Sequence, residues 1–512
     1  MGDSGRPPCS HAIGAPRRRR GPLGSAIRSR APSRARLANR RRWSSMSGAA
    51  ITHLGGQTPM DSRLRHLAEQ LDAGLIARRQ FLRQAAMITG GTAAGLAVLR
   101  SMASAQPKTR LRVWLFKSYV TGGNDILAKQ VEAWARERGV DVEFDWATFG
   151  DREQKFVAAI EAGNPPDIAE MNYQGPMRYR PALRDVTKLA RSIAAERGGL
   201  LPHADRVVQY QGQYYGIARL SFGGGLHIRK DLVAEKGLKM PKVYDPDLVE
   251  IAKKCQDPSK DLWGFGQTLN RSDDARGFLQ NLLWDYGGSV WDKDGKPALA
   301  TSNLKPNMAA IQFAVDTIQK HKIQPPGVMG WTDLHNNEAF MAGKLVSTNN
   351  GASLYYAMGA RKNPLYEKTQ VILTPGGPAG SFFFSGAYNW GLFKASKHAD
   401  LCEDLVRWVE DEKRFEEYMK ACSGQAGPVY KSRAEHPYWK TDPNYEGMKE
   451  NILRSVWPGY PGPITPAAIE VEAQYVLADM GGRIVVGGLS IEAALKEAHK
   501  RVEDIYRIRS RG

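Results

Sequence analysis

The 512-residue chain contains only four cysteines, which excludes a fold built on a disulfide framework. No apolar run reaches the roughly 20 residues of a membrane-spanning helix, so we do not expect an integral membrane protein. The sequence also lacks H-E-x-x-H, G-x-S-x-G, C-x-x-C and the Gly-rich phosphate loops. We therefore expect no metal and no cofactor, although pairs of acidic residues leave a glycosidase open.

Positive charge is concentrated at the start of the chain. The protein carries 72 Lys and Arg against 53 Asp and Glu, a formal net charge of +19. Residues 1–105 contain 18 Arg, no Lys and 4 acidic residues, a net charge of +14, which leaves +5 for residues 106–512. The body of the protein therefore has no basic stripe that would indicate a nucleic-acid partner.

The first 105 residues have the composition of leader segments. Residues 1–59 are rich in Arg, Gly, Ser, Pro and Ala and are predicted to be a disordered basic extension, either a nucleic-acid tail or a misplaced translation start before Met60. Residues 60–105 contain Arg78-Arg79 before Phe81-Leu82, a mildly apolar stretch over 85–99, and Ala103-Ser104-Ala105. This order predicts a twin-arginine signal peptide, cleaved after Ala105, and a periplasmic protein. A membrane-anchoring helix is the alternative.

Three cysteines remain after residue 105: Cys255, Cys402 and Cys422. A Cys402–Cys422 disulfide is one possibility. Three small buried residues are the other. The sequence alone leaves both open.

The region after the leader alternates between strand and helix patterns. Strands are predicted at 111–116, 140–146 and 167–171, separated by helical spacings that end near Gly139 and Gly163. This order predicts an α/β lobe with a parallel sheet, and ligands of such sheets bind beyond the carboxyl ends of the strands. Residues 117–119 and 171–173 are therefore candidate contacts.

The second region has a more helical pattern. Helices are predicted at 248–254, 308–321 and 338–343, and Ser490 is predicted to cap a final helix. A turn-rich hairpin is expected at 286–296, and a strand at 345–348 that ends at Asn349-Asn350-Gly351. Residues 374–378 have the composition of a hinge-like break.

Several short motifs then indicate a family. They comprise, in order, residues 159–168, Gln213–Ile217, Arg229–Leu232, Trp263-Gly264-Phe265, Gly287-Gly288, Asp294-Gly295-Lys296, Ala339–Lys344, Asn350-Gly351 and Asn389–Leu392. In this order the body resembles the extracellular solute-binding proteins of ABC importers, family 1, the sugar-binding, maltose-binding-protein-like group. Ala218 and Arg229 depart from the family pattern.

The resemblance implies an α/β periplasmic-binding-protein fold of type II, with two lobes that each have a mainly parallel sheet flanked by helices. It places lobe 1 at 106–218 and 374–400, and lobe 2 at 220–372 and 405–512. Crossings between the lobes are expected near 218–221, near 373–375 and in a helix at 400–409. The lobes would close on a solute like a hinged clamp.

Family position and the strand-end argument together select the candidate ligand-binding residues. The expected polar contacts are Lys117, Tyr119, Asn172, Asn350, Tyr388 and Asn389. The expected stacking residues are Trp284, Trp331 and Trp390, for which core packing is the alternative. Asn350 could instead be a turn former, and Tyr388 and Asn389 could pack within a strand.

The predicted function is capture of a carbohydrate or a related polar solute, without catalysis. The expected partners are the ABC permease subunits and the Tat export machinery, with no nucleic acid, and the protein is expected to be a monomer. The alternative function is a Tat-exported periplasmic enzyme, either a cofactor-dependent oxidoreductase or a glycosidase. The resemblance does not identify the solute.

Overall fold

The computed structural model describes residues 109–148 and 151–510, and upstream of these only residues 63, 66, 67, 70, 80, 84, 87 and 88. The chain forms two compact units, Met1–Gln106 and Pro107–Gly512. The described residues of the first unit are helical. The predicted extension at 1–59, the motif Arg78-Arg79 and the cleavage site after Ala105 lie outside the described residues.

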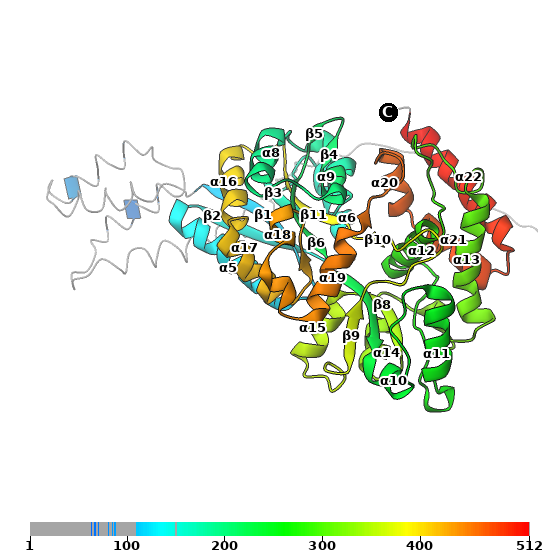
Figure 1. The fold of residues 1–512 in the computed structure, drawn as a ribbon. Coiled ribbons are helices and arrows are strands. Elements are labelled where there is room, and N and C mark those ends of the chain that lie inside the picture. Colours follow the sequence, from blue (N-terminus) through cyan, green and yellow to red (C-terminus); the bar gives the residue numbers. More distant parts are fainter. Residues whose placement is uncertain are drawn as a thin grey trace, which may run out of the picture. The chain divides into compact units, whose positions relative to one another are not determined.

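The second unit contains a six-stranded sheet with the order β12-β6-β11-β3-β1-β2 (Figure 1). Its strands are β1 (Arg110–Phe116), β2 (Asp141–Ala147), β3 (Ile168–Met171), β6 (Ile217–Phe222), β11 (Ala387–Leu392) and β12 (Ala426–Gly427). Strand β1 pairs in parallel with β2 and β3, whereas β11 is antiparallel to both β3 and β6. The three predicted strands and their parallel arrangement are confirmed.

Helices cover both faces of this sheet and complete the first lobe. They are α5 (Thr121–Arg138), α6 (Arg152–Glu161), α7 (Gly175–Arg178), α8 (Thr187–Glu196), α9 (Pro202–Val208), α16 (Ala399–Val409), α17 (Glu412–Ala421) and α18 (Lys431–Ala434), with 3-10 turns η1 (Arg180–Ala182) and η5 (Pro437–Lys440) and a small hairpin β4 (Gln209–Tyr210) and β5 (Gln213–Tyr214). Helix α5 ends as predicted, because Gly139 adopts the left-handed conformation with φ 64° and caps it.

The second lobe is built on a three-stranded sheet with the order β8-β7-β9. The strands are β7 (Gly224–Arg229), β8 (Ser347–Gly351) and β9 (Thr369–Ile372), and β7 is antiparallel to both neighbours. The prediction of a mainly parallel sheet in each lobe is therefore wrong for this lobe. Only Gly223 separates β7 from β6, so β6 sets the direction in which β7 enters the second lobe. This direction is opposite to that of both β8 and β9.

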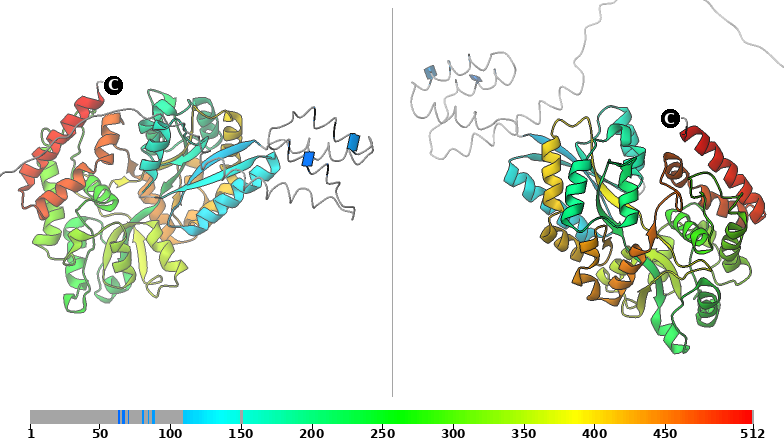
Figure 2. Two further views of the ribbon diagram at one scale, coloured as in Figure 1. Left: turned by 180° about the vertical axis from the view of Figure 1, so that it is seen from behind. Right: turned by 45° about the horizontal axis from the view of Figure 1, so that its top comes forward.

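The helices of the second lobe surround this sheet and extend beyond it. They are α10 (Lys230–Glu235), α11 (Val249–Cys255), α12 (Asp273–Asp285), α13 (Leu304–Gln319), α14 (His335–Met341), α15 (Ala352–Ala360), α19 (Pro443–Leu453), α20 (Pro466–Ala473), α21 (Val476–Val485) and α22 (Ile491–Arg509), with short turns η2 (Tyr244–Leu248), η3 (Pro258–Lys260) and η4 (Val328–Gly330). Figure 2 shows α22, in red, at the side of the second lobe, where it packs against α13, α20 and α21. The predicted helices at 248–254, 308–321 and 338–343 are confirmed within a few residues.

The predicted strand at 345–348 is shifted along the chain, and the predicted cap at Ser490 is confirmed. The strand predicted at 345–348 begins at Ser347 and continues to Gly351, so Asn349 and Asn350 lie within the strand and not beyond its end. In the final helix Ser490 Oγ accepts the backbone N–H of Ala493, which confirms the predicted cap.

The lobes are joined by three crossings. The first consists of Gly223 alone, between β6 and β7. The expected crossing at 218–221 therefore ends two residues too early and lies within β6. A Cβ at Gly223 would lie 2.5 Å from the backbone oxygen of Gly424, and the close approach explains why glycine occupies this position. The second crossing runs from β9 to β11 and includes β10 (Phe383–Phe384), which pairs in parallel with β13 (Ser455–Val456), the strand that follows α19.

Helix α19 makes the third crossing. Asn451 is fully buried in it, and its Nδ2 donates to the backbone oxygens of Gly224 and Ile372 at 3.0 and 3.2 Å. Its Oδ1 accepts the backbone N–H of Thr374 at 3.1 Å. One amide side chain therefore connects all three crossings.

The expected third crossing in the helix at 400–409 is not what the structure has. Residues of α16 and α17 are buried in the core of the six-stranded sheet, as are Tyr430 and Trp439. The chain from 405 to 439 thus packs with the first lobe, whereas the sequence analysis assigned it to the second. The strongly one-sided apolar pattern of these helices does not reveal which of two cores it faces.

Cys255, Cys402 and Cys422 are buried and free. The interpretation as small buried residues is confirmed, and the Cys402–Cys422 disulfide is not formed. Among the residues that the structure describes, no helix is both long and apolar enough to cross a membrane.

Candidate binding cleft

A cavity of about 220 Å³ lies between the two sheets, next to the crossings. It is lined from the first lobe by the end of β6, by Arg152 and Tyr173, and by the segment that leads into β11. From the second lobe it is lined by β8, by the loop at Gln267 and by the first two turns of α12. Because both lobes contribute walls, a movement of one lobe relative to the other would open or close this site.

Aromatic side chains form one wall. Phe222 and Tyr388 stack with ring centroids 4.3 Å apart and planes inclined by 23°. Phe116 lies behind Tyr388 at 5.1 Å, and Tyr173 meets Phe384 edge to face, also at 5.1 Å. Rings in this arrangement offer flat apolar faces that can cover the C–H surfaces of a small polar molecule.

Amide side chains in the cleft carry polar atoms without partners. Gln267 is 1% exposed, and among the described residues neither its Oε1 nor its Nε2 has a hydrogen-bond partner. Asn281 and Asn349 each leave Oδ1 unpaired in the same way, although Nδ2 of Asn349 donates to the Tyr244 hydroxyl at 3.1 Å. A buried polar atom left unpaired costs about 1–3 kcal/mol, so these atoms are arranged to bind something else.

Arg152 is the charged group on the wall of the first lobe. Its guanidinium donates to the Tyr388 hydroxyl at 2.9 Å and forms an ion pair with Glu153 at 3.1 Å. Burial alone would lower the pKa of Arg152, but Tyr388 and Glu153 raise it above the ordinary arginine value. The group therefore stays charged at the edge of the cleft.

Helix α12 presents a second set of charges from the opposite lobe. Ser272 caps it by accepting the Ala275 N–H at 3.0 Å, which places Asp273 and Asp274 in the first turn, where the helix dipole favours negative charge. Arg276, one turn on, pairs with Asp273 at 3.1 Å and with Glu472 at 3.6 Å.

The titration of these carboxyls follows their surroundings. Burial would raise the pKa of Asp273, but Arg276, the Tyr475 hydroxyl and Arg152 together lower it below its ordinary value. Burial raises the pKa of Glu472 to about 7, against the opposing effect of Arg276. Asp273 is thus the anionic partner of Arg276 at neutral pH.

The structure brings some of the predicted contacts to the cleft. Asn350 and Tyr388 line it. Nδ2 of Asn350 donates to Oδ1 of Asn337, which orients the side chain. Tyr119 is half exposed on the first lobe, and burial, followed by the charges of Asp333, Asp273 and Asp274, raises its pKa.

Asn172 and Asn389 are buried beside one another and bind the protein itself. Nδ2 of Asn172 donates to Glu153 at 3.0 Å, and Nδ2 of Asn389 donates to the backbone oxygen of Asn172, also at 3.0 Å. Asn389 follows Tyr388 in strand β11 and points to the opposite face, so it does not line the cleft. Lys117 is exposed at the end of β1, outside the cavity lining.

The three predicted stacking tryptophans lie elsewhere. Trp390 is fully buried and donates to Glu410 at 2.9 Å, and Trp284 is buried against Phe384 and Tyr460. Trp331 lies in a separate groove of the second lobe. The core-packing alternative is therefore correct for Trp284 and Trp390. The aromatic rings that line the cleft are those of phenylalanine and tyrosine residues.

Several residues of the cleft were not selected from the sequence. They are Arg152, Phe222, Gln267, Asp273, Asp274, Arg276, Asn281 and Asn349, whereas Tyr173 lies in the predicted stretch 171–173. The serine followed by two aspartates at 272–274 is a helix-start pattern that could have placed α12. No sequence signal placed that helix start against the first lobe, because this contact depends on the crossings.

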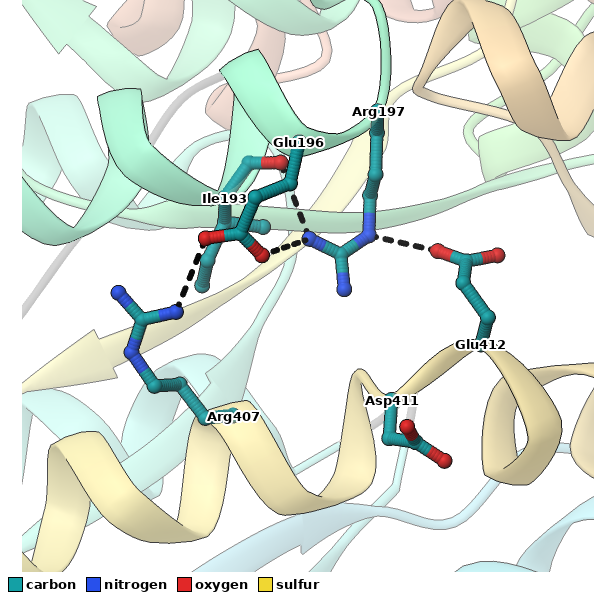
Figure 3. A pocket seen from close by; sticks show the side chains of 6 residues that line it. All are labelled: Ile193, Glu196, Arg197, Arg407, Asp411 and Glu412. Carbon is teal, nitrogen blue, oxygen red and sulfur yellow. Dashed lines mark hydrogen bonds and ion pairs between the residues drawn. The ribbon is translucent and has the colours of Figure 1, made fainter.

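A second charged pocket, on the first lobe, is satisfied by its own residues (Figure 3). Arg197 forms ion pairs with Glu412 at 2.7 Å and Glu196 at 3.6 Å, and Arg407 pairs with Glu196 at 3.2 Å. Within the described residues no group of three or more His, Cys, Asp or Glu side chains is placed to hold a metal ion. The cleft therefore remains the candidate site.

Comparison with known proteins agrees with this geometry. The sequence model described as bacterial extracellular solute-binding protein matches residues 118–413, more than half of the chain. The chain belongs to this family. Membership confirms the predicted family and the interpretation as a binding protein, and it places the protein among extracellular proteins.

Solved structures share the two-lobe α/β fold. Maltose-bound MalE3 of T. maritima has a TM-score of 0.68 and 22% identity over 78% of this chain and 100% of that one. An ABC transporter solute-binding protein from Thermotoga lettingae TMO, bound with alpha-D-tagatose, has a TM-score of 0.68 and 18% identity over 78% and 100%. A third, from Agrobacterium radiobacter K84 in complex with ribitol, has a TM-score of 0.65 and 20% identity over 78% and 98%.

Proposed function

We propose that this protein captures a carbohydrate or a related polyol in the cleft between its lobes and delivers it to the membrane subunits of an ABC importer. The observation that carries the proposal is that the same cavity is lined by two stacked rings, Phe222 and Tyr388, and by two amides with unpaired polar atoms. Among the described residues, both polar atoms of Gln267 and Oδ1 of Asn281 have no hydrogen-bond partner. Rings cover C–H faces and amides exchange hydrogen bonds with hydroxyls, which is the combination that a polyhydroxylated solute requires.

The size of the cavity favours a small solute. Its volume of about 220 Å³ lies below the roughly 300–1,000 Å³ of sites for drug-sized ligands. The relatives with tagatose and ribitol show that the fold accepts solutes of monosaccharide size. We propose a monosaccharide or a polyol of similar size as the solute.

We further propose that the protein is exported to the periplasm through the twin-arginine route, with cleavage after Ala105, and acts there as a monomer. The support is the order of Arg78-Arg79, the apolar stretch and Ala103-Ser104-Ala105. The lobe surfaces beside the cleft would contact the permease, and the closed form would be the one recognised. Replacing both arginines by lysine should stop export, whereas export of that variant at the normal level would exclude this route.

The binding proposal is tested by calorimetry and thermal unfolding of the purified full chain with neutral sugars and polyols. A solute at 100 times its dissociation constant should stabilise the folded protein by about 2.7 kcal/mol. X-ray scattering should show a smaller radius of gyration in the presence of the same solute. Absence of any stabilisation across the sugars and polyols, together with turnover of one of them, would refute the proposal.

A further inference from the structure

The charged groups around the cleft are unequally divided between the lobes. On the first lobe, Arg152 and Arg178 both pair with Glu153, at 3.1 and 3.3 Å. On the second lobe, Arg276 pairs with two carboxyls, Asp273 and Glu472. Two further carboxyls, those of Asp274 and Asp333, lie beside them. Three guanidinium groups and five carboxyls therefore lie at or near the cleft, and four of the five carboxyls belong to the second lobe. Burial raises the pKa of Asp274, Asp333 and Glu472, so these three carboxyls do not all carry full charge in the empty protein.

Asp274 and Asp333 form a pair of neighbouring carboxyls. Burial and the charge of Asp333 raise the pKa of Asp274, and burial raises the pKa of Asp333 although Arg276 opposes this, so the empty pair tends to keep a proton. Oδ1 of Asp333 accepts the backbone N–H of Asp274 at 2.9 Å, and Oδ2 of Asp274 accepts from Nδ2 of Asn336 at 2.7 Å. In the part of the chain that the structure describes, neither carboxyl forms an ion pair with a Lys or Arg side chain. The dipole of α12 favours the carboxylates in its first turn, those of Asp273 and Asp274. It does not explain Asp333, which comes from the loop before α14.

An independent feature of the same cavity points to a ligand. Gln267 is 99% buried and lines the cleft together with Asp274, and both polar atoms of its side chain are unpartnered. A solute that approached Gln267 would therefore also meet the carboxyl of Asp274.

We infer that the cleft selects a hydroxylated solute that also carries a cationic amine, such as an amino sugar, and discriminates against anionic sugars. The inference rests on the proposed solute-binding function and narrows its substrate class. An ammonium group placed at Asp274, beside Asp333, would favour the ionised form of both carboxyls, displace the proton that the empty pair holds, and donate charge-assisted hydrogen bonds to them. A carboxylate or phosphate on the solute would instead add like charge to this wall.

The test uses matched solutes and the purified full chain at neutral pH. Calorimetric titrations compare the glucose, galactose and mannose series, each as the neutral sugar, the 2-amino sugar and the uronate. In the series that binds, the amino sugar should bind about 10- to 100-fold more tightly than the neutral sugar, and the uronate should bind least tightly. This order supports the inference.

Two other results have distinct meanings. If a neutral sugar binds at least as tightly as its amino counterpart, the inference is overturned and the solute-binding function stands. If no member of the three series binds, and neutral pentitols and hexitols do not bind either, both the inference and the proposed function fail.

Two variants test whether the preference for an amino sugar comes from Asp274 and Asp333. Asp274→Asn and Asp333→Asn keep an acceptor oxygen but remove charge, so each should reduce the ratio of amino-sugar affinity to neutral-sugar affinity about tenfold. Asp141→Asn is the matched control, because Asp141 is an exposed carboxyl paired with Arg110 on the outer strand β2. Circular dichroism verifies folding. Unchanged preference in both folded cleft variants would overturn the inference.

Discussion

Replacing Gln267 by leucine should change stability and affinity in opposite directions. The side chain is buried, and neither end of its amide has a partner among the described residues. Leucine has a similar volume and no polar atoms, so the substitution removes an unsatisfied group without leaving a large cavity. If the amide serves the solute, the empty protein loses nothing by its removal.

The magnitudes follow from the two unpaired atoms. Each unpaired buried atom costs about 1–3 kcal/mol, and water that enters the cavity recovers part of this. We therefore expect Gln267→Leu to raise the free energy of unfolding of the empty protein by about 0.5–2 kcal/mol. The same change should weaken binding of the solute about 10- to 100-fold, because one or two hydrogen bonds are lost. Urea unfolding and calorimetric titration measure the two quantities.

Gln324→Leu is the matched control, since Gln324 is a buried glutamine whose amide is fully used by the protein. Its Oε1 accepts the backbone N–H of Gln267 at 2.7 Å, and its Nε2 donates to Thr317 at 2.8 Å. This variant should lower the free energy of unfolding by about 1–3 kcal/mol, because the buried N–H of Gln267 is left unpaired, whereas Thr317 Oγ1 loses a donor but still donates to Ala314. If Gln267→Leu behaves like Gln324→Leu, with lost stability and unchanged affinity, then Gln267 is a structural residue and the reasoning is refuted.

Three further predictions concern the hinge and the aromatic wall. Asn451→Ala removes the amide that joins the three crossings and should lower the free energy of unfolding by about 2–4 kcal/mol, as measured in urea; a loss below 0.5 kcal/mol would contradict this role. Burial raises the pKa of Asp285 to about 8, although the Phe382 N–H opposes this, so stability should fall by up to about 1.4 kcal/mol per unit as pH rises from about 4 to 8. In Asp285→Asn that decline should be absent from thermal scans, and its persistence would assign it to other groups. Phe222→Ala should weaken sugar binding about tenfold in calorimetric titrations, since it removes one of the stacked rings. Unchanged affinity would show that this ring does not contact the solute.

The direction of the Asp285 prediction follows from proton binding. Between about pH 4 and 8 the folded protein holds a proton on this carboxyl that the unfolded chain has already released. Raising the pH therefore favours the unfolded chain over this window, and the effect ends once the folded protein also loses the proton. Asparagine keeps the oxygen that accepts the Phe382 N–H, so the variant tests the charge and not the hydrogen bond.

Local patterns predicted the elements of both lobes well. The β-branched and aromatic content of β1 and the apolar spacing of α5 are properties of neighbouring residues, and so is the cap at Ser490. The order of short motifs was also sufficient to indicate the family, which the match over residues 118–413 confirmed. These features need no knowledge of distant contacts.

The residues of the cleft were harder to predict, as the tryptophans illustrate. Trp390 and Tyr388 are both aromatic residues of β11 and point to the same face, yet Trp390 is enclosed by the core and Tyr388 lies at the cavity. Their difference depends on what the other elements place above the sheet at each position. Asn349 and Gln267 were missed for the same reason, because an amide signals a ligand only when its surroundings leave it unpaired.

The sequence by itself indicated an α/β protein, because strand and helix periodicity and helix caps are local properties of the chain, and the order of its short motifs indicated the family of two-lobe binding proteins. Only the tertiary structure decided which lobe receives residues 405–439, which way β7 runs against its neighbours, and which side chains meet across the cleft. Those outcomes arise where Gly223, residues 374–386 and α19 cross between the lobes and bring distant residues into contact, and no local pattern encodes such contacts.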